Sequence, residues 1–321
     1  MTDLVTRAQI IMLAQLLDVE PAELSGLERL GAAPVEALRR AMSDALFDAL
    51  ATVFRRVSKL APLIPDALAA TVAVKAVPPE VAGRGGGAIG MDHQHRAASL
   101  ISRMSPAYLA DAAPYVDPRV IPFFAPKLPF ALLVPAADEL LRRRDYVTAA
   151  RFVEHGTDEL IREFERHVRD DAAIVRTGAM VSRTEVLNTI LRTVSAERRE
   201  RLVAAGAAGD DELLAATLSL LGRIDAEFAR PMSNHFFESQ GAEGVSVLGA
   251  RIVAAGAVAE LLDVVEYLAA DTVRGLTAVA ELSDPAALRR AAGTGRRESA
   301  VGRLLGAKAP ARATADWLSP H

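Results

Sequence analysis

The chain has 321 residues, of which 51% are hydrophobic but only 5% aromatic, so Ala, Leu and Val supply most of its apolar side chains. This composition favours helices over a large sheet, and the absence of cysteine excludes disulfides, thiolate zinc sites and cysteine nucleophiles. The formal net charge is −4, while the chain from Arg289 onward is basic, and such an acidic body is poorly suited to a dedicated nucleic-acid-binding protein.

The N-terminal region, residues 1–82, is predicted to be helical. A first helix is expected over Asp3–Asp18. The longest helix is expected over about residues 34–60 (Pro34–Leu60), where apolar side chains recur every three or four residues. That stripe favours a helix packed within the chain, and the alternative is a homodimer through the same helix. A further short helix is expected over Asp66–Val77.

The segment Leu13–Glu28 resembles the helix–turn–helix of repressor-type DNA-binding domains, and a DNA-binding element would comprise residues 8–31. The segment that would be the recognition helix carries Glu23 and Glu28, with Arg29 as its only cation. Base edges and phosphates are bound by Arg, Lys, Asn or Gln. An ordinary packed helical hairpin is therefore favoured over a DNA-reading element.

Residues 83–97 are rich in glycine and histidine, and we predict a flexible linker here. Free backbone amides in such a loop can bind a phosphate, but neither a Walker Lys-Ser pair nor a preceding strand accompanies them. Asp92, His93 and His95 are candidate ligand-binding residues, because loops carry sites more often than scaffolds do. Two histidines at i and i+2 point apart on a helix, so no metal site is predicted.

Residues 98–206 are predicted to be a helical-repeat region. Four segments begin at a residue suited to a helix start, namely Pro106, Pro129, Asp158 and Arg183, with spacings of 23, 29 and 25 residues. A ladder of this period is typical of stacked helix pairs. The many prolines are expected at helix starts and not inside helices. The predicted fold class is therefore all-α, with stacked short helix pairs forming a superhelical, repeat-like body.

The turns Met104-Ser105-Pro106-Ala107-Tyr108-Leu109-Ala110-Asp111 and Val116-Asp117-Pro118-Arg119-Val120 resemble those of a known family. They look like the cytosolic N-terminal helical superhelix of MgtE-type magnesium transporters, and the middle region of flagellar switch proteins is similar. The resemblance covers Ser99–Gly206 and implies a superhelical fold without the transporter's membrane part. The module of that family responds to divalent ions through surface carboxylates, but no sharp motif carries a metal residue over to this chain.

A C-terminal helical region is predicted over residues 207–292, after a boundary at Gly206–Gly209. It is expected to break near Gly256 and to end with a short helix that starts at Asp284-Pro285. Residues 293–321 are predicted to be a disordered basic tail.

Within the C-terminal region, His235 and Glu238 are the candidate catalytic residues. Their i,i+3 spacing would place them on one face of a helix, as an acid–base pair requires. One such pair cannot complete the coordination shell of a metal. The favoured alternative is a helix end capped by Ser233 or Asn234.

Paired phenylalanines stand near both candidate regions. Phe123, Phe124 and Phe130 belong to an almost wholly apolar stretch, and Phe236 and Phe237 follow His235. All five are candidate ligand-binding residues. If the chain has a ligand pocket, we expect it between the proline-rich units and the His235–Glu238 segment, with Phe123, Phe124, Phe236 and Phe237 as its apolar walls. The favoured alternative is that these aromatic side chains are core residues.

The function predicted from these features is that of a helical-repeat binding or scaffold protein for a protein partner or an apolar small molecule. The alternatives are an enzyme with a helical pocket that performs acid–base chemistry on a hydrophobic substrate, and a DNA-binding regulator. No cofactor is predicted. The early acid in the N-terminal segment argues against a signal peptide, and no apolar run is long enough to span a bilayer, so a cytoplasmic location is expected.

Overall fold

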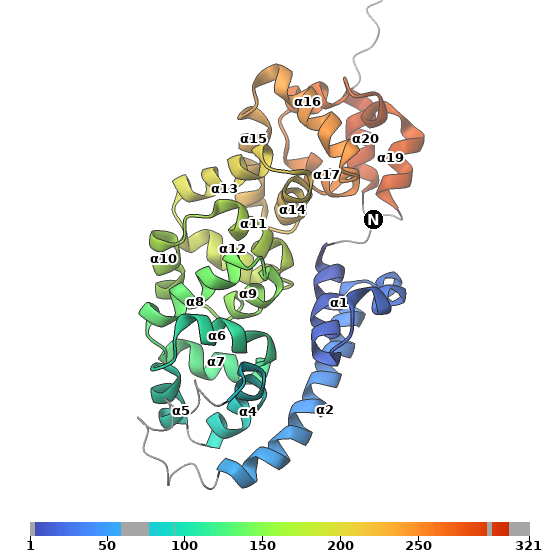
Figure 1. Cartoon of the computed structure of the whole chain (residues 1–321). Helices are drawn as coiled ribbons and strands as arrows, with labels where there is room; N and C mark the ends of the chain where they lie inside the picture. The colour runs from blue at the N-terminus through green and yellow to red at the C-terminus, as the bar shows by residue number, and fades with distance from the viewer. Residues whose placement is uncertain (1–3, 59–76, 93, 294–296, 308–321) are drawn as a thin grey trace, which may run out of the picture. The chain divides into compact units, whose positions relative to one another are not determined.

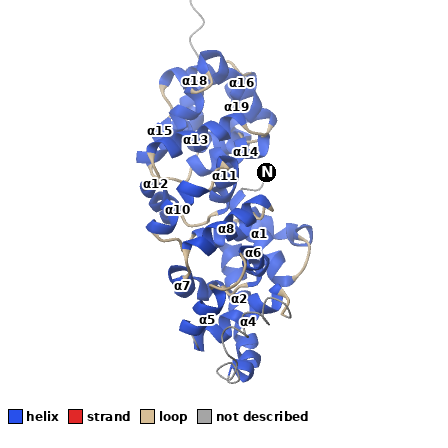
Figure 2. Cartoon of the chain, turned by 60° about the vertical axis from the view of Figure 1, so that its left-hand side comes forward, coloured by secondary structure: helices blue, strands red, loops and turns tan. Residues whose placement is uncertain are grey.

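A computed structural model describes residues 4–58, 77–92, 94–293 and 297–307. All regular structure in these residues is helical, as the apolar spacing predicted (Figure 2). No helix in this part of the chain combines the length and apolar character needed to cross a membrane. The chain divides into two compact bodies, the first unit (residues 1–198) and the second unit (residues 199–321).

The first unit holds the N-terminal helices and the predicted repeat region (Figure 1). Its elements, with 3-10 helices marked η, are α1 (Leu4–Leu17), η1 (Pro21–Leu30), α2 (Ala32–Ser58), α4 (Pro79–Asp92), α5 (Gln94–Ile101), α6 (Pro106–Ala112), η3 (Ala113–Tyr115), η4 (Pro118–Val120), α7 (Ile121–Phe124), η5 (Ala125–Lys127), α8 (Phe130–Arg142), α9 (Tyr146–Val153), α10 (Asp158–His167), α11 (Asp171–Met180) and α12 (Thr184–Thr193). Helix α13 (Ala196–Ala208) begins at its end.

Alternate helices of the repeat region stack on one another. Helix α8 contacts α6 and α10, α10 contacts α12, and α9 contacts α11 (Figure 1). The four predicted starts are confirmed, because Pro106 and Asp158 are the first residues of α6 and α10, while Pro129 and Arg183 are the N-caps of α8 and α12. The buried side chains between these helices form one continuous apolar core.

Side-chain caps fix several helix starts in this stack. Ser105, Asp145, Thr157 and Asp170 each accept a hydrogen bond from the backbone N–H three residues later. Each such cap satisfies an amide that has no partner within its helix and contributes about 1 kcal/mol. Capping therefore sets the start of each short helix, and tertiary packing supplies the rest of its stability.

Helices α1 and α2 pack on the same unit. Helix α1 contacts α9 and α11, and α2 contacts α1 and α4. Val35 on α2 is fully buried against Ile10 and Leu13 of α1, so the apolar stripe predicted over residues 34–60 packs within the chain at this end. The homodimer through this helix stays a prediction. The short helix predicted over Asp66–Val77 falls outside the described residues apart from its last position.

The element after α1 differs from a DNA-binding motif. Residues Pro21–Leu30 form a 3-10 helix, not the α-helix that a recognition element requires. Its start carries a capping box in which the backbone N–H of Glu20 donates to Glu23 Oε1. The favoured reading, a packed hairpin, agrees with the contacts of this element with α1 and α2.

The prediction of a flexible linker over residues 83–97 is wrong. Residues Pro79–Asp92 form α4, and α5 follows. Two of the glycines face close neighbours: a Cβ on Gly83 would lie 2.6 Å from the carbonyl oxygen of Ala112, and one on Gly85 would lie 2.7 Å from the ring of Phe54. The glycines therefore permit close approach of α4 to α2 and to the α6–η3 segment, and this packing offsets their poor helix propensity.

A pair of glycine substitutions tests this explanation. Gly83→Ala is expected to destabilise the first unit by about 1–3 kcal/mol, because the added methyl meets backbone that cannot move cheaply. Gly86→Ala in the same helix is the matched control, since a Cβ there meets nothing within 4 Å. The control is expected to be neutral or to stabilise by up to about 1 kcal/mol. Urea unfolding of both variants measures the difference, and equal midpoints would contradict a packing role.

One proline of the repeat region departs from the prediction that its prolines stand only at helix starts, because Pro135 lies inside α8. Pro231, in the second unit, also lies inside a helix, α15 (Ala226–Glu238). Each leaves the carbonyl four residues earlier without its helical hydrogen bond. In α8 the flanking Val134 and Ala136 are both buried, so burial of the helix face offsets this loss.

The second unit is built from the rest of α13 and the helices that follow it. These are α14 (Asp211–Leu221), α15, α16 (Gly241–Ala254), α17 (Val258–Val264), η6 (Val265–Tyr267), α18 (Ala270–Leu276), η7 (Ala280–Ser283), α19 (Pro285–Ala292) and α20 (Glu298–Ala307). The predicted break occurs after α16, where Gly256 has φ +69. The predicted start at Asp284-Pro285 is also confirmed, because Asp284 caps α19. Gly206, where a domain boundary was predicted, lies inside α13.

The prediction of a disordered tail from residue 293 is wrong over residues 298–307. These residues form α20, which contacts α18, α19 and η6. Leu304 is fully buried, and Arg297 pairs with Asp263 through hydrogen bonds of 2.8 and 2.6 Å. The arginines of this stretch led to the prediction of a solvated tail, but Arg297 instead binds a side chain of the second unit. Residues 294–296 and 308–321 lie outside the described part.

Four arginines recur in the same role through both units. Each donates from its two terminal nitrogens to two backbone carbonyls at the end of a helix 30 to 44 residues earlier. Carbonyls at a helix end lack the full set of intrahelical partners, and a cation is favoured beside them. We call these contacts arginine forks. They are Arg151 on Pro114 and Val116, Arg198 on Glu165 and Val168, Arg251 on Ala207 and Gly209, and Arg303 on Val265 and Leu268. The Val265 carbonyl also accepts from the Leu268 N–H.

Candidate functional site

The predicted catalytic pair lies on α15 of the second unit. His235 is half-buried and Glu238 is exposed, and among the described residues no hydrogen bond or ion pair joins them. The predicted cap at Ser233 or Asn234 is wrong, because α15 begins at Ala226 and both residues lie inside it. Asn234 instead ties α15 to a later turn: its side chain donates to the Tyr267 carbonyl and accepts from the Ala269 N–H.

The predicted aromatic residues divide between the two units. Phe236 and Phe237 are fully buried, with ring centroids 5.1 Å apart in an edge-to-face arrangement, and Phe124 is buried in the first unit. These three are core side chains. Phe123 and Phe130 are 45% and 39% exposed. A ligand pocket shared by the two aromatic groups stays a prediction.

The predicted ligand-binding residues near the glycine-rich stretch lie on helices. Asp92 is the last residue of α4, His95 is an exposed residue of α5, and His93 falls outside the described residues. No group of three or more His, Asp or Glu side chains in the described ranges is placed to hold a metal ion.

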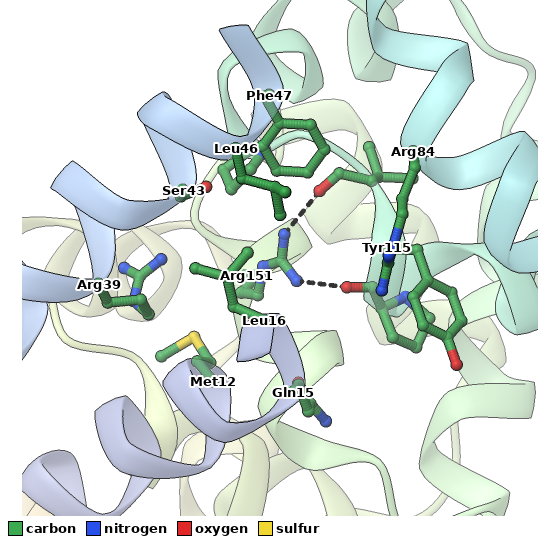
Figure 3. A pocket seen from close by; sticks show the side chains of 13 residues that line it. Met12, Gln15, Leu16, Arg39, Ser43, Leu46, Phe47, Arg84, Tyr115 and Arg151 are labelled. Carbon is green, nitrogen blue, oxygen red and sulfur yellow. Dashed lines mark hydrogen bonds between the residues drawn. The ribbon is translucent and has the colours of Figure 1, made fainter. Parts of the chain in front are cut away.

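A different site is formed in the first unit, where α1 and α2 meet α4, η3, η4 and α9. It is a cavity of about 30 Å³ that we call the arginine pocket (Figure 3). Its lining comprises Met12, Gln15, Leu16, Arg39, Ser43, Leu46, Phe47, Arg84, Pro114, Tyr115, Val116, Pro118 and Arg151. Since a water molecule needs some 10–15 Å³ on this measure, the space suits a few water molecules or one small polar group.

Arg151 stands at the centre of the arginine pocket (Figure 3). Its terminal nitrogens donate to the carbonyls of Pro114 and Val116 at 3.0 and 2.8 Å, which holds the guanidinium in one orientation. Its Nε is buried without a hydrogen-bond partner. Burial, with the nearby charge of Arg39 as the next cause, lowers the pKa of Arg151 to about 10, so the group still carries its charge at neutral pH.

Two more guanidinium groups line the cavity. Arg39 comes from α2, and its Nε donates to Gln9 Oε1 of α1 at 2.9 Å. Burial also lowers the pKa of Arg39. Arg84 comes from α4, with its guanidinium 5.7 Å from the ring centroid of Tyr115 and one nitrogen 3.2 Å from Glu80. Helices distant in the sequence thus bring three cations to one small space.

The carboxylates nearest to Arg39 and Arg151 have other partners. Among the described residues none lies within ion-pair distance of either arginine. Asp117 binds Arg119, Asp145 caps α9, Glu154 accepts from Ser182, and Glu36 pairs with Arg40. Their longer-range attraction raises the pKa of the two arginines but is outweighed by burial. The charge of the arginine pocket is therefore incompletely matched by the residues that the structure describes.

Buried polar atoms without partners gather on the two helices beside the cavity. Gln15 Oε1 and Arg151 Nε belong to residues that line it, and Gln9 Nε2 and Thr148 Oγ1 lie on the same helices, α1 and α9. Native structures pair most buried polar atoms with protein or with water. A group of such atoms is therefore unusual, and it distinguishes this part of the first unit.

Sequence reasoning missed this site, because its cations come from three separate segments. One local signal was present: Arg151 follows Ala149-Ala150 and precedes Phe152-Val153, so a charge interrupts an apolar helix. The same pattern surrounds Arg251 and Arg303. An arginine in such a setting is buried only when its donors find partners.

No known protein family model matches the chain, and neither the curated proteins nor the solved structures yield a match.

Proposed function

We propose that the protein is a helical-repeat binding protein and that the arginine pocket of the first unit is its ligand site. The observation that supports this is the meeting of six elements, α1, α2, α4, η3, η4 and α9, around a cavity beside buried polar atoms that lack partners. Binding sites in helical folds lie between facing helices and combine apolar walls with a few convergent polar groups. Leu16, Leu46 and Phe47 supply the apolar part here.

The lining changes the chemistry expected of the ligand. The sequence favoured an apolar small molecule or a protein partner, whereas three arginines in the wall favour a ligand with a polar group. Binding of a protein partner to the repeat region, a homodimer and a cytoplasmic location remain proposals based on the sequence alone. The architectural resemblance to the MgtE-type superhelix is a proposal of the same kind.

Methyl NMR tests the proposed function. Met12 lines the arginine pocket and Met232 is buried in the second unit, so 13C-methyl labelling of methionine provides a reporter and an internal control. Met12→Leu assigns the reporter signal. When neutral, cationic and anionic metabolites are added in turn, we expect at least one class to move the Met12 signal while Met232 stays in place.

The same samples separate binding from turnover. A binding protein is expected to return its ligand chemically unchanged, as mass spectrometry of the recovered compound would show. If no compound of any charge class moves the Met12 signal, the pocket is not a ligand site. Conversion of the ligand to product would favour the enzyme alternative instead.

A further inference from the structure

The arginine forks at Arg198 and Arg151 differ in whether a carboxylate lies beside the guanidinium. At Arg198 the terminal nitrogens bind the carbonyls of Glu165 and Val168, and Nε lies 2.8 Å from Oδ1 of Asp171. At Arg151 the terminal nitrogens bind two carbonyls in the same way, but no carboxylate of the described residues stands beside Nε. The described residues thus contain one fork paired with a carboxylate and one, at Arg151, that lines a cavity without such a carboxylate.

The three positive charges of the arginine pocket favour the binding of a negatively charged group there. Burying a guanidinium is costly unless it is paired, and Arg39 and Arg151 add mutual repulsion to that cost. Within the described part of the chain, Arg84 alone of the three arginines has a carboxylate at close range, that of Glu80, whose side chain is half exposed. An anion between the three arginines would offset both the loss of hydration and the repulsion.

We propose that the arginine pocket binds a small oxyanion, either a phosphate or the carboxylate head of a small organic acid, through Arg39, Arg84 and Arg151. The proposal rests on the proposed function and adds the ligand class to it. The anion would supply to Arg151 the negative charge that Asp171 supplies to Arg198. A cavity of about 30 Å³ admits a head group of a few heavy atoms, so a larger ligand would extend beyond it.

The experiment uses the full-length protein at constant ionic strength, adjusted with potassium chloride. Inorganic phosphate, ethyl phosphate, acetate and succinate are titrated while the Met12 methyl signal is followed, and calorimetry gives the affinity. Glycerol and ethylamine are the neutral and cationic probes. We expect saturable shifts with at least one oxyanion and none with the neutral or cationic probe. Comparison of phosphate with ethyl phosphate, and of acetate with succinate, distinguishes a free anion from the head of an organic ligand.

Two neighbouring arginines on α2 give a matched pair of variants. Arg39→Gln removes a cation from the pocket lining, whereas Arg40→Gln removes one that is mostly exposed and paired with Glu36. We expect Arg39→Gln to weaken oxyanion binding at least tenfold and Arg40→Gln to leave it unchanged. Arg84→Gln supplies a second pocket variant from another helix, and melting curves establish that each variant is folded.

The outcomes distinguish the two proposals. Shifts of Met12 by neutral or cationic compounds alone would overturn the oxyanion proposal and leave the binding function intact. No shift with any compound would overturn both. Equal weakening by Arg39→Gln and Arg40→Gln would show a general charge effect and overturn the assignment of this pocket.

Discussion

Truncation after Ala292 is expected to destabilise the second unit by at least about 4 kcal/mol, because it removes the whole of α20. Leu304 is fully buried and Val301 nearly so, and burial of such side chains contributes about 1.5–3 kcal/mol each. The deletion also exposes the carbonyls of Val265 and Leu268, which Arg303 binds. Calorimetric melting of the truncated chain measures the loss.

A second truncation, after Ala307, is the control because it keeps α20 and removes only residues 308–321. It is expected to melt close to the full-length chain. Leu304→Ala in the full-length chain should reproduce part of the effect, at about 2–5 kcal/mol. If the chains ending at 292 and 307 melt alike, the packing of α20 makes no contribution to stability.

Replacement of Arg198 by methionine is expected to lower the free energy of unfolding of the first unit by roughly 3 kcal/mol. Arg198 is 2% exposed and binds two carbonyls and Asp171. Methionine keeps much of the apolar stem but leaves a carboxylate and two buried acceptors without their cation. Urea unfolding, followed by circular dichroism, gives the difference.

Arg166→Met is the control for this variant, since Arg166 is mostly exposed and pairs only with Glu163 of its own helix. Exposed pairs contribute at most about 1 kcal/mol, so little change is expected. Arg198→Lys should restore only part of the stability, because one ammonium group lacks the fork geometry that serves two carbonyls and a carboxylate together. Full rescue by lysine would show that charge, not geometry, is what the position requires.

The helices of the chain were predictable because their signals are local. The starts at Pro106 and Asp158 are set by residue types that suit a helix N-terminus. The three- and four-residue spacing of apolar side chains then gives the helix face that packs, as on α1 and α2. Such features act within one or two turns, so the sequence displays them directly.

The failures arise where a distant contact outweighs a local preference. The glycine-rich sequence around Gly83 and Gly85 predicted a loop, but both residues lie in α4. Without a side chain they allow this helix to approach the Ala112 carbonyl and the Phe54 ring. The charges of Arg297 and Arg303 predicted a solvated tail. In the structure Arg297 binds Asp263, and Arg303 binds a carbonyl of η6. The arginine pocket follows the same rule, because Arg39, Arg84 and Arg151 meet only when the first unit has folded.

The arginine forks have a consequence for the evolution of the chain. Their acceptors are backbone carbonyls, carried by residues as different as Pro114, Glu165, Gly209 and Leu268. The residues that supply the accepting carbonyls can therefore be substituted by other residue types, whereas the donor must remain arginine. With one fixed residue about every 50 positions, descendants of this repeat can keep their architecture while losing nearly all resemblance in sequence. We expect distant relatives to be recognised by the spacing of these arginines before any other feature.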